Sequence, residues 1–191
     1  MRRQTAAATC IVLATATTAC GRERIRPPDT VKPEAPLALA AQGFPQEGLF
    51  LERPSNWPFL RGRAPLVASA TSGTATVALW RYLRSEPLPR EDELLDAAQS
   101  ALQEAVRARD GSFAVERAER VEVDGAPAIQ LLGTETIAGR KRRVRSTHVY
   151  AKGAEVVLDA YAPPEEFARV DETVFAPILE SLRIDPPEGT P

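Results

Sequence analysis

The chain has 191 residues, of which 43% are hydrophobic and 26% charged, a balance typical of a soluble domain large enough to bury one core. Lysine and arginine total 24 against 26 aspartate and glutamate residues. The formal net charge of -2 therefore gives no reason to expect nucleic acid as a partner, and one domain is expected.

The first twenty residues have the order of a bacterial export signal. Two arginines form a basic start, residues 6–16 form a mildly apolar run, and small residues lead to Cys20. The apolar run is too short to span a bilayer core, which needs about 20 residues. The segment 18–21, Thr-Ala-Cys-Gly, resembles the lipobox of bacterial lipoproteins. In that motif the cysteine is lipidated and becomes the first residue of the mature chain.

Two fates remain open for this signal. Lipidated Cys20 would hold the exported protein on the outer face of the cell membrane. Conventional cleavage after Ala16 or Ala19 would leave a free thiol instead, because Thr17 stands where the lipobox family prefers leucine. Residues 20–43 are rich in proline and have no apolar period, so we expect a disordered tether that reaches up to about 60 Å.

The first half of the folded domain is expected to contain three strands and one helix. Residues 48–54 form a short strand, followed by a loop in which Trp57 closes one end of the core. A hairpin spans 64–71 and 74–83, and its second strand is apolar on both faces, which predicts a central strand covered on both sides. Residues 90–109 predict a helix with one apolar stripe, formed by Leu94, Leu95, Ala98, Ala101, Leu102, Ala105 and Val106.

The second half predicts a four-stranded antiparallel meander and a final helix. The strands cover 113–123, 128–137, 144–152 and 155–161, with turns at Asp124-Gly125, Gly139-Arg140 and Lys152-Gly153. A helical region then runs to about Leu182, and Pro177 predicts a kink or break between Thr173 and Ala176. Residues 185–191 are expected to be disordered.

This order of elements predicts an α+β fold. Three segments resemble landmarks of the PsbP/Mog superfamily and its bacterial lipoprotein members: residues 54–57 (Pro-Ser-Asn-Trp), 123–128 (Val-Asp-Gly-Ala-Pro-Ala) and 175–183 (Phe-Ala-Pro-Ile-Leu-Glu-Ser-Leu-Arg). The resemblance covers about residues 44–184. It implies an α/β/α sandwich around a twisted antiparallel sheet of about six to seven strands, used mainly as a protein-binding platform. Relatives bind a photosystem complex or a small GTPase, and no catalytic signature is among the shared motifs.

Enzymatic activity is not expected. Ser146 and His148 share one strand face, and Asp159 could approach from the next strand. A hydrolase would need Ser146 and His148 within hydrogen-bond reach of each other in an open cleft, and no Gly-x-Ser-x-Gly elbow presents the serine. A single histidine and the lack of an Asp-x-Asp-x-Asp-Gly loop leave no cage for zinc or calcium, so no metal or cofactor is expected.

One concentrated run of positive charge begins at the second meander turn. Either this run is a solvated turn, or it is a surface for lipid headgroups, another anion or an acidic partner. The residues of this candidate surface are Arg140, Lys141, Arg142, Arg143 and Arg145.

The sequence therefore predicts a lipid-anchored binding or accessory module of the cell envelope without enzymatic activity. Its expected partners are the membrane, through the anchor, and an envelope protein complex. One alternative is a carrier that holds a small apolar ligand between sheet and helix. The other is a hydrolase that uses Ser146 and His148.

Overall fold

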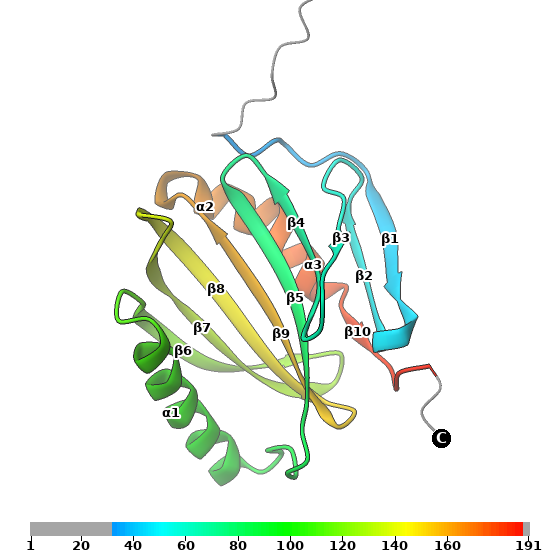
Figure 1. Ribbon diagram of the computed structural model, residues 1–191, viewed down its shortest axis with the longest axis vertical. Coiled ribbons are helices and arrows are strands. Elements are labelled where there is room, and N and C mark those ends of the chain that lie inside the picture. Colours follow the sequence, from blue (N-terminus) through cyan, green and yellow to red (C-terminus); the bar gives the residue numbers. More distant parts are fainter. Residues whose placement is uncertain (1–31, 189–191) are drawn as a thin grey trace, which may run out of the picture.

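The computed structural model describes residues 32–188, so the predicted signal, Cys20 and the first part of the predicted tether lie outside the described residues. A seven-stranded antiparallel sheet forms the centre, with helices on both faces and a three-stranded sheet beside it (Figure 1). This is the predicted α+β sandwich around a twisted antiparallel sheet. Among residues 32–188, no helix is both long and apolar enough to cross a membrane.

The large sheet has the order β3-β4-β5-β9-β8-β7-β6, and the small sheet has the order β1-β2-β10. The strands are β1 Leu39–Phe44, β2 Leu49–Pro54, β3 Leu60–Arg61, β4 Leu66–Ser72, β5 Ala75–Leu83, β6 Ala114–Val123, β7 Ala126–Ile137, β8 Arg140–Ala151, β9 Ala154–Ala162 and β10 Arg183–Ile184. The helices are the 3-10 turn η1 Pro45–Glu47, α1 Asp92–Arg109, α2 Pro164–Val170, the π-helix η2 Asp171–Phe175 and α3 Ala176–Glu180.

The predicted meander is confirmed as β6 to β9. Each of its three turns has two central residues with positive φ, the geometry of the tight hairpin turn that matches strand twist. These pairs are Asp124 and Gly125, Ala138 and Gly139, and Lys152 and Gly153. The middle turn was predicted one residue too late, because the alanine at 138 gave no turn signal before the glycine.

The face of the large sheet that carries α2, η2 and α3 holds the larger core. Trp57 is fully buried there, and its ring meets Phe175 edge-on with centroids 6.4 Å apart. The predicted position of Trp57 at the end of the core is thus confirmed. The predicted kink or break appears as the π-helix η2, in a chain that stays helical from Pro164 to Glu180. The Ala176 amide bonds to Asp171 O, five residues back, and Pro177 follows without an N–H of its own.

The opposite face carries only α1. That helix packs over β6, β7 and β8 through a separate cluster that includes Leu95, Val106, Ile129 and Leu131, while no helix lies over β4 and β5 (Figure 1). The prediction that β5 is central is confirmed by its pairing with β4 and β9. The prediction that both its faces are covered is wrong, since Tyr82 remains 37% exposed.

The predicted tether, residues 20–43, extends too far toward the domain. Residues 39–43 belong to β1, which pairs with β2 along its whole length. Two alanines, a glutamine and a glycine follow Leu39 and carry little strand propensity of their own, so the partner strand determines this conformation. The predicted disordered tail is wrong for its first residues, because the Asp185 amide bonds to Gly48 O at 2.8 Å and the Glu188 amide to Pro45 O at 3.0 Å.

Candidate functional site

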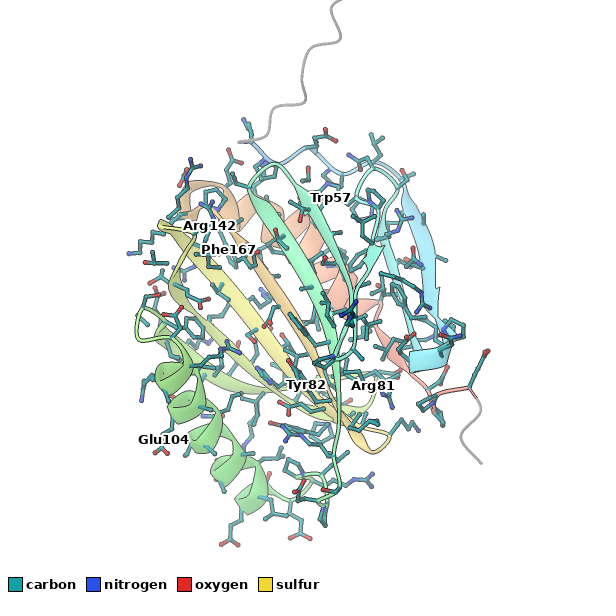
Figure 2. The ribbon with its side chains drawn as sticks, in the orientation of Figure 1. Trp57, Arg81, Tyr82, Glu104, Arg142 and Phe167 are labelled. Atoms are coloured by element: carbon teal, nitrogen blue, oxygen red, sulfur yellow. The ribbon has the colours of Figure 1, made fainter. Side chains whose placement is uncertain are left out.

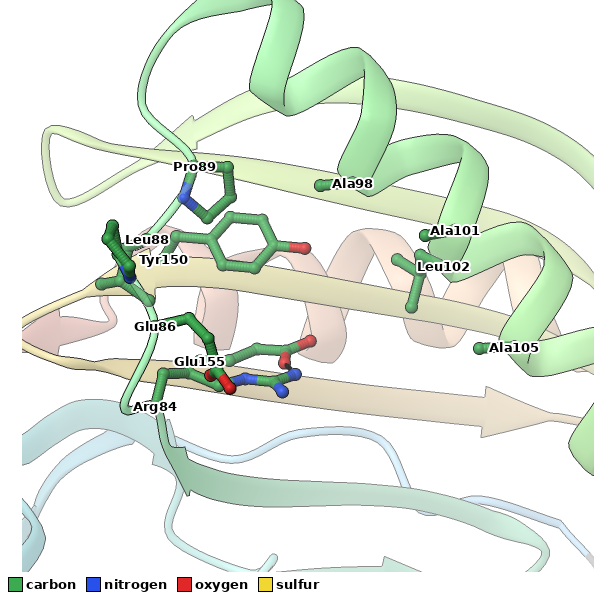
Figure 3. A pocket seen from close by; sticks show the side chains of 11 residues that line it. Arg84, Glu86, Leu88, Pro89, Ala98, Ala101, Leu102, Ala105, Tyr150 and Glu155 are labelled. Atoms are coloured by element: carbon green, nitrogen blue, oxygen red, sulfur yellow. Dashed lines mark hydrogen bonds and ion pairs between the residues drawn. The ribbon is translucent and has the colours of Figure 1, made fainter.

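A groove runs between α1 and the large sheet. Its first cavity holds about 410 Å³ and has a mainly apolar wall of Leu88, Pro89, Ala98, Ala101, Leu102 and Ala105. Figure 3 shows the Tyr150 ring inside this cavity, with Arg84 and Glu155 together at one side. The volume and the mixture of apolar wall with few polar groups are those of a small-molecule site.

The groove exists because the apolar stripe of α1 is wider than the surface that the sheet covers. Leu95 and Val106 are buried on the sheet, and Leu102 is half-buried beside them. Ala101 and Ala105 lie on the flank of the stripe and stay exposed. Since alanine side chains are short, this flank does not fill the space above β8 and β9.

A second cavity of about 260 Å³ extends the groove and shares Arg84 and Glu155 with the first. Tyr82, Arg109, Ser146, His148 and Asp159 also line it. We call the two cavities together the α1 groove.

A chain of polar contacts forms the floor of the second cavity. Ser146 Oγ lies 3.0 Å from His148 Nε2, and His148 Nδ1 lies 2.6 Å from Glu155 Oε1. Glu155 also forms an ion pair with Arg84, and Ser146 Oγ donates to Asp159 Oδ1 at 2.5 Å. Alternation along β8 and β9 puts these side chains on one face, and the register sets Ser146 opposite Asp159.

Burial and hydrogen bonding act against each other at Glu155. Burial raises the pKa of Glu155, but hydrogen bonds from His148 and Arg84 outweigh it and hold that pKa below its ordinary value. The carboxyl is therefore ionised at neutral pH. Burial beside this carboxylate raises the pKa of Tyr150 to about 12, so the phenol keeps its proton.

Among these polar contacts, the hydrogen bond between Ser146 and Asp159 has a defined donor. Ser146 has one hydroxyl hydrogen, and its Oγ donates to Asp159 Oδ1 at 2.5 Å. In a hydrolase the serine hydroxyl donates to the imidazole instead, so the bond to Asp159 is not the catalytic arrangement.

The Ser146–His148 pair thus meets only part of the requirement for a hydrolase. The two side chains are within hydrogen-bond reach, and Asp159 approaches as anticipated. However, Ser146 is only 6% exposed and His148 only 9%, so access is narrow. Ser146 is also paired to Leu131 and Asp159 in a central strand, where ladder bonds occupy the backbone amides that an oxyanion hole would need.

The five cations of the predicted basic surface separate into two groups. Arg143 pairs with Glu116 at 3.0 Å and lies over the Phe167 ring, and Arg145 pairs with Asp171 at 2.5 Å. Among residues 32–188, no ion pair joins Arg140, Lys141 or Arg142 to a carboxylate. The predicted surface is therefore reduced to these three side chains, of which Arg140 and Lys141 are exposed and Arg142 half-buried.

Within the described part of the chain, no three His, Cys, Asp or Glu side chains are grouped so as to hold a metal ion. Cys20, the predicted lipidation site, lies outside the described residues. The α1 groove itself was not among the sites predicted from the sequence. The sequence did contain an indication of the groove. The apolar stripe of α1 has seven residues, which is more than one sheet surface covers.

No family model matches the sequence, and no curated protein matches it. Solved structures do match. The cyanobacterial PsbP protein (CyanoP) of Synechocystis aligns with 78% of this chain and 93% of its own length, with a TM-score of 0.61 at 11% identity. LpqN of Mycobacterium tuberculosis, described as involved in cell envelope biogenesis, aligns with 78% of this chain and 91% of its own, with a TM-score of 0.54 at 19% identity.

The Ran-binding protein Mog1p of Saccharomyces cerevisiae aligns with 78% of this chain and 96% of its own, with a TM-score of 0.51 at 8% identity. These likenesses show that the chain has the PsbP/Mog-type fold, as the sequence resemblance implied. At such low identity they show the fold alone.

Proposed function

We propose that the chain is an exported, lipid-anchored binding module of the cell envelope that holds a small, largely apolar ligand in the α1 groove. The α1 groove is the observation that carries this proposal. A closed, well-packed contact between sheet and helix would have spoken against a carrier, and a cavity of about 410 Å³ lies there instead. The envelope location is supported by the export signal and by the likeness to LpqN.

Binding in the α1 groove can be tested with an uncharged apolar dye, N-phenyl-1-naphthylamine. Residues 21–191 contain every described element, and this soluble form should bind the dye with a rise in fluorescence. Ala101→Phe fills the groove from its exposed flank and should weaken binding at least about tenfold, since each buried methylene contributes about 0.8 kcal/mol. Ser100→Phe, on the far side of α1, is the matched control and should change nothing. Equal binding in both variants would refute the groove as the site.

The anchor has its own test, because Cys20→Ser removes the acceptor thiol. The wild-type precursor should incorporate radiolabelled palmitate and reach its mature size, whereas the variant should remain unlabelled and unprocessed. The two or three acyl chains typical of this lipoprotein class make membrane attachment effectively permanent. A variant that still runs as mature, labelled protein would contradict lipidation at Cys20.

A hydrolase is the second candidate, because Ser146 Oγ lies 3.0 Å from His148 Nε2. A fluorophosphonate reagent, which labels activated serines, separates the two functions. We expect no labelling, since Ser146 donates its hydrogen to Asp159 and faces no oxyanion hole. Labelling that disappears in Ser146→Ala but persists in Ser69→Ala would establish the hydrolase instead.

A further inference from the structure

The first described residues show where the preceding chain leaves the domain. Lys32 lies 3.9 Å from Glu166 of α2, and Arg169 of α2 donates to Pro33 O at 3.2 Å. The predicted tether therefore reaches the domain beside α2, at the upper end of the molecule in Figure 1.

The turn between β7 and β8 lies at the same end. β9 finishes at Ala162, which pairs with Arg143, so residues 140–142 of β8 extend beyond the last residue of β9. Arg143 lies over Phe167 of α2 with its guanidinium carbon 5.8 Å from the ring centre. Figure 2 shows Arg142 and Phe167 together at this end.

This turn carries positive side chains that form no ion pair with the carboxylates of residues 32–188. Arg143 and Arg145 are held by Glu116 and Asp171, whereas Arg140, Lys141 and Arg142 have no carboxylate partner among residues 32–188. Glu166 of α2 is already paired with Arg169. We call Arg140, Lys141 and Arg142 the basic tip.

We propose that the basic tip contacts anionic lipid headgroups and sets the orientation of the domain on the membrane. This rests on the lipid anchor of the proposed function, since the tether and the basic tip lie at one end of the domain. Residues 84–89, which line the first cavity of the α1 groove, lie at the other end of the domain (Figure 1). The anchored domain thus holds residues 84–89, at this rim of the groove, away from the bilayer.

The expected strength of this contact follows from surface electrostatics. Each basic side chain within a Debye length of an anionic leaflet contributes about 1 kcal/mol. Three side chains together correspond to roughly a hundredfold in affinity, since about 1.4 kcal/mol is a factor of ten. The contact is screened by salt, so it weakens steeply between low and physiological ionic strength.

The test uses residues 21–191, which lack Cys20 and so bind without acyl chains. We expect cosedimentation with vesicles of phosphatidylglycerol and phosphatidylcholine at low salt, and none with phosphatidylcholine alone. Changing Arg140, Lys141 and Arg142 together to Gln should weaken binding roughly a hundredfold. The control changes Arg63, Arg90 and Lys152 to Gln; these exposed cations lie away from the tether, and the change in net charge is the same.

Two results would overturn the proposal. One is absence of binding to anionic vesicles at low salt, which would leave an acidic protein as the partner for the basic tip. The other is an equal loss in both triple variants, which would mean that net charge alone governs binding. Neither result depends on palmitate labelling at Cys20, so failure of the anchor and failure of the basic tip are distinguishable.

Discussion

The two faces of the seven-stranded sheet are built from alternate residues of the same strands. One, which we call the closed face, is filled by the larger core beneath α2, η2 and α3, although a cavity of about 460 Å³ lies at its edge beside η1 and β4. The other carries the α1 groove. On β8, Val149 enters the larger core under α2 and α3, whereas its neighbours His148 and Tyr150 face the groove side. One face therefore serves mainly to hold the fold together. The other combines a smaller core with buried polar side chains and open space.

Side-chain size explains this difference. The closed face is filled by aromatic rings, with Trp57 and Phe167 both packed against Phe175. On the open face, α1 contributes alanines at its flank and cannot fill the space beside the sheet. Stability should consequently depend more on the closed face, and ligand binding on the open one.

The largest expected effect is on the closed face. Phe175→Ala removes a fully buried ring and should lower the free energy of unfolding by about 3–5 kcal/mol in urea titrations. The matched change on the open face is Leu102→Ala, which removes a half-buried side chain beside the groove and should cost only about 1–2 kcal/mol. Equal losses would break the distinction between the two faces.

The polar floor of the groove should show a smaller effect that depends on pH. Glu155→Gln removes the carboxylate that pairs with both His148 and Arg84 and should cost about 2 kcal/mol at pH 7. The folded-state pKa of Glu155 lies below its ordinary value of 4.5. The stability that the ionised carboxylate contributes is therefore fully present above pH 4.5. It is lost as the pH falls through the folded-state pKa. Urea titrations at several pH values should therefore show the two proteins converging in acid, and a constant difference would contradict this.

The smallest expected effect on the free energy of unfolding comes from substitutions at two arginines of the predicted basic surface. Arg145→Met should cost about 1–2 kcal/mol, because it leaves Asp171, only 17% exposed, without its cation. Burial already raises the pKa of Asp171, and Arg145 opposes that rise. Arg142→Met should change the free energy of unfolding by less than about 0.5 kcal/mol. A similar loss in both variants would mean that Arg142 has a structural role like that of Arg145.

The sequence predicted the fold well where local patterns and tertiary packing agree. Alternation and glycine turns indicated the meander, and Pro177 indicated the irregular helical segment that appears as η2. It failed at β1, because Leu39–Phe44 contains small residues whose strand conformation depends on pairing with β2. Propensity carries no information about such a partner.

The candidate site was only partly predictable for a similar reason. Period two placed Ser146 beside His148, but it could not show that Asp159 accepts the serine hydrogen or that Glu155 lies 2.6 Å from the imidazole. The basic surface was predicted by charge alone, and carboxylates from β6 and η2 removed two of its five members. These contacts join residues far apart in sequence, so they required the structure.

The central claim is that the face carrying α1 holds the ligand in the α1 groove. The most direct measurement is photocrosslinking of the full chain in its own membrane, with p-benzoylphenylalanine at Ala101 inside the α1 groove or at Ser100 on the far side of the helix. We predict one defined small-molecule adduct from position 101, found by mass spectrometry and absent from position 100. Identical adducts from both positions, or none from position 101, would contradict the account.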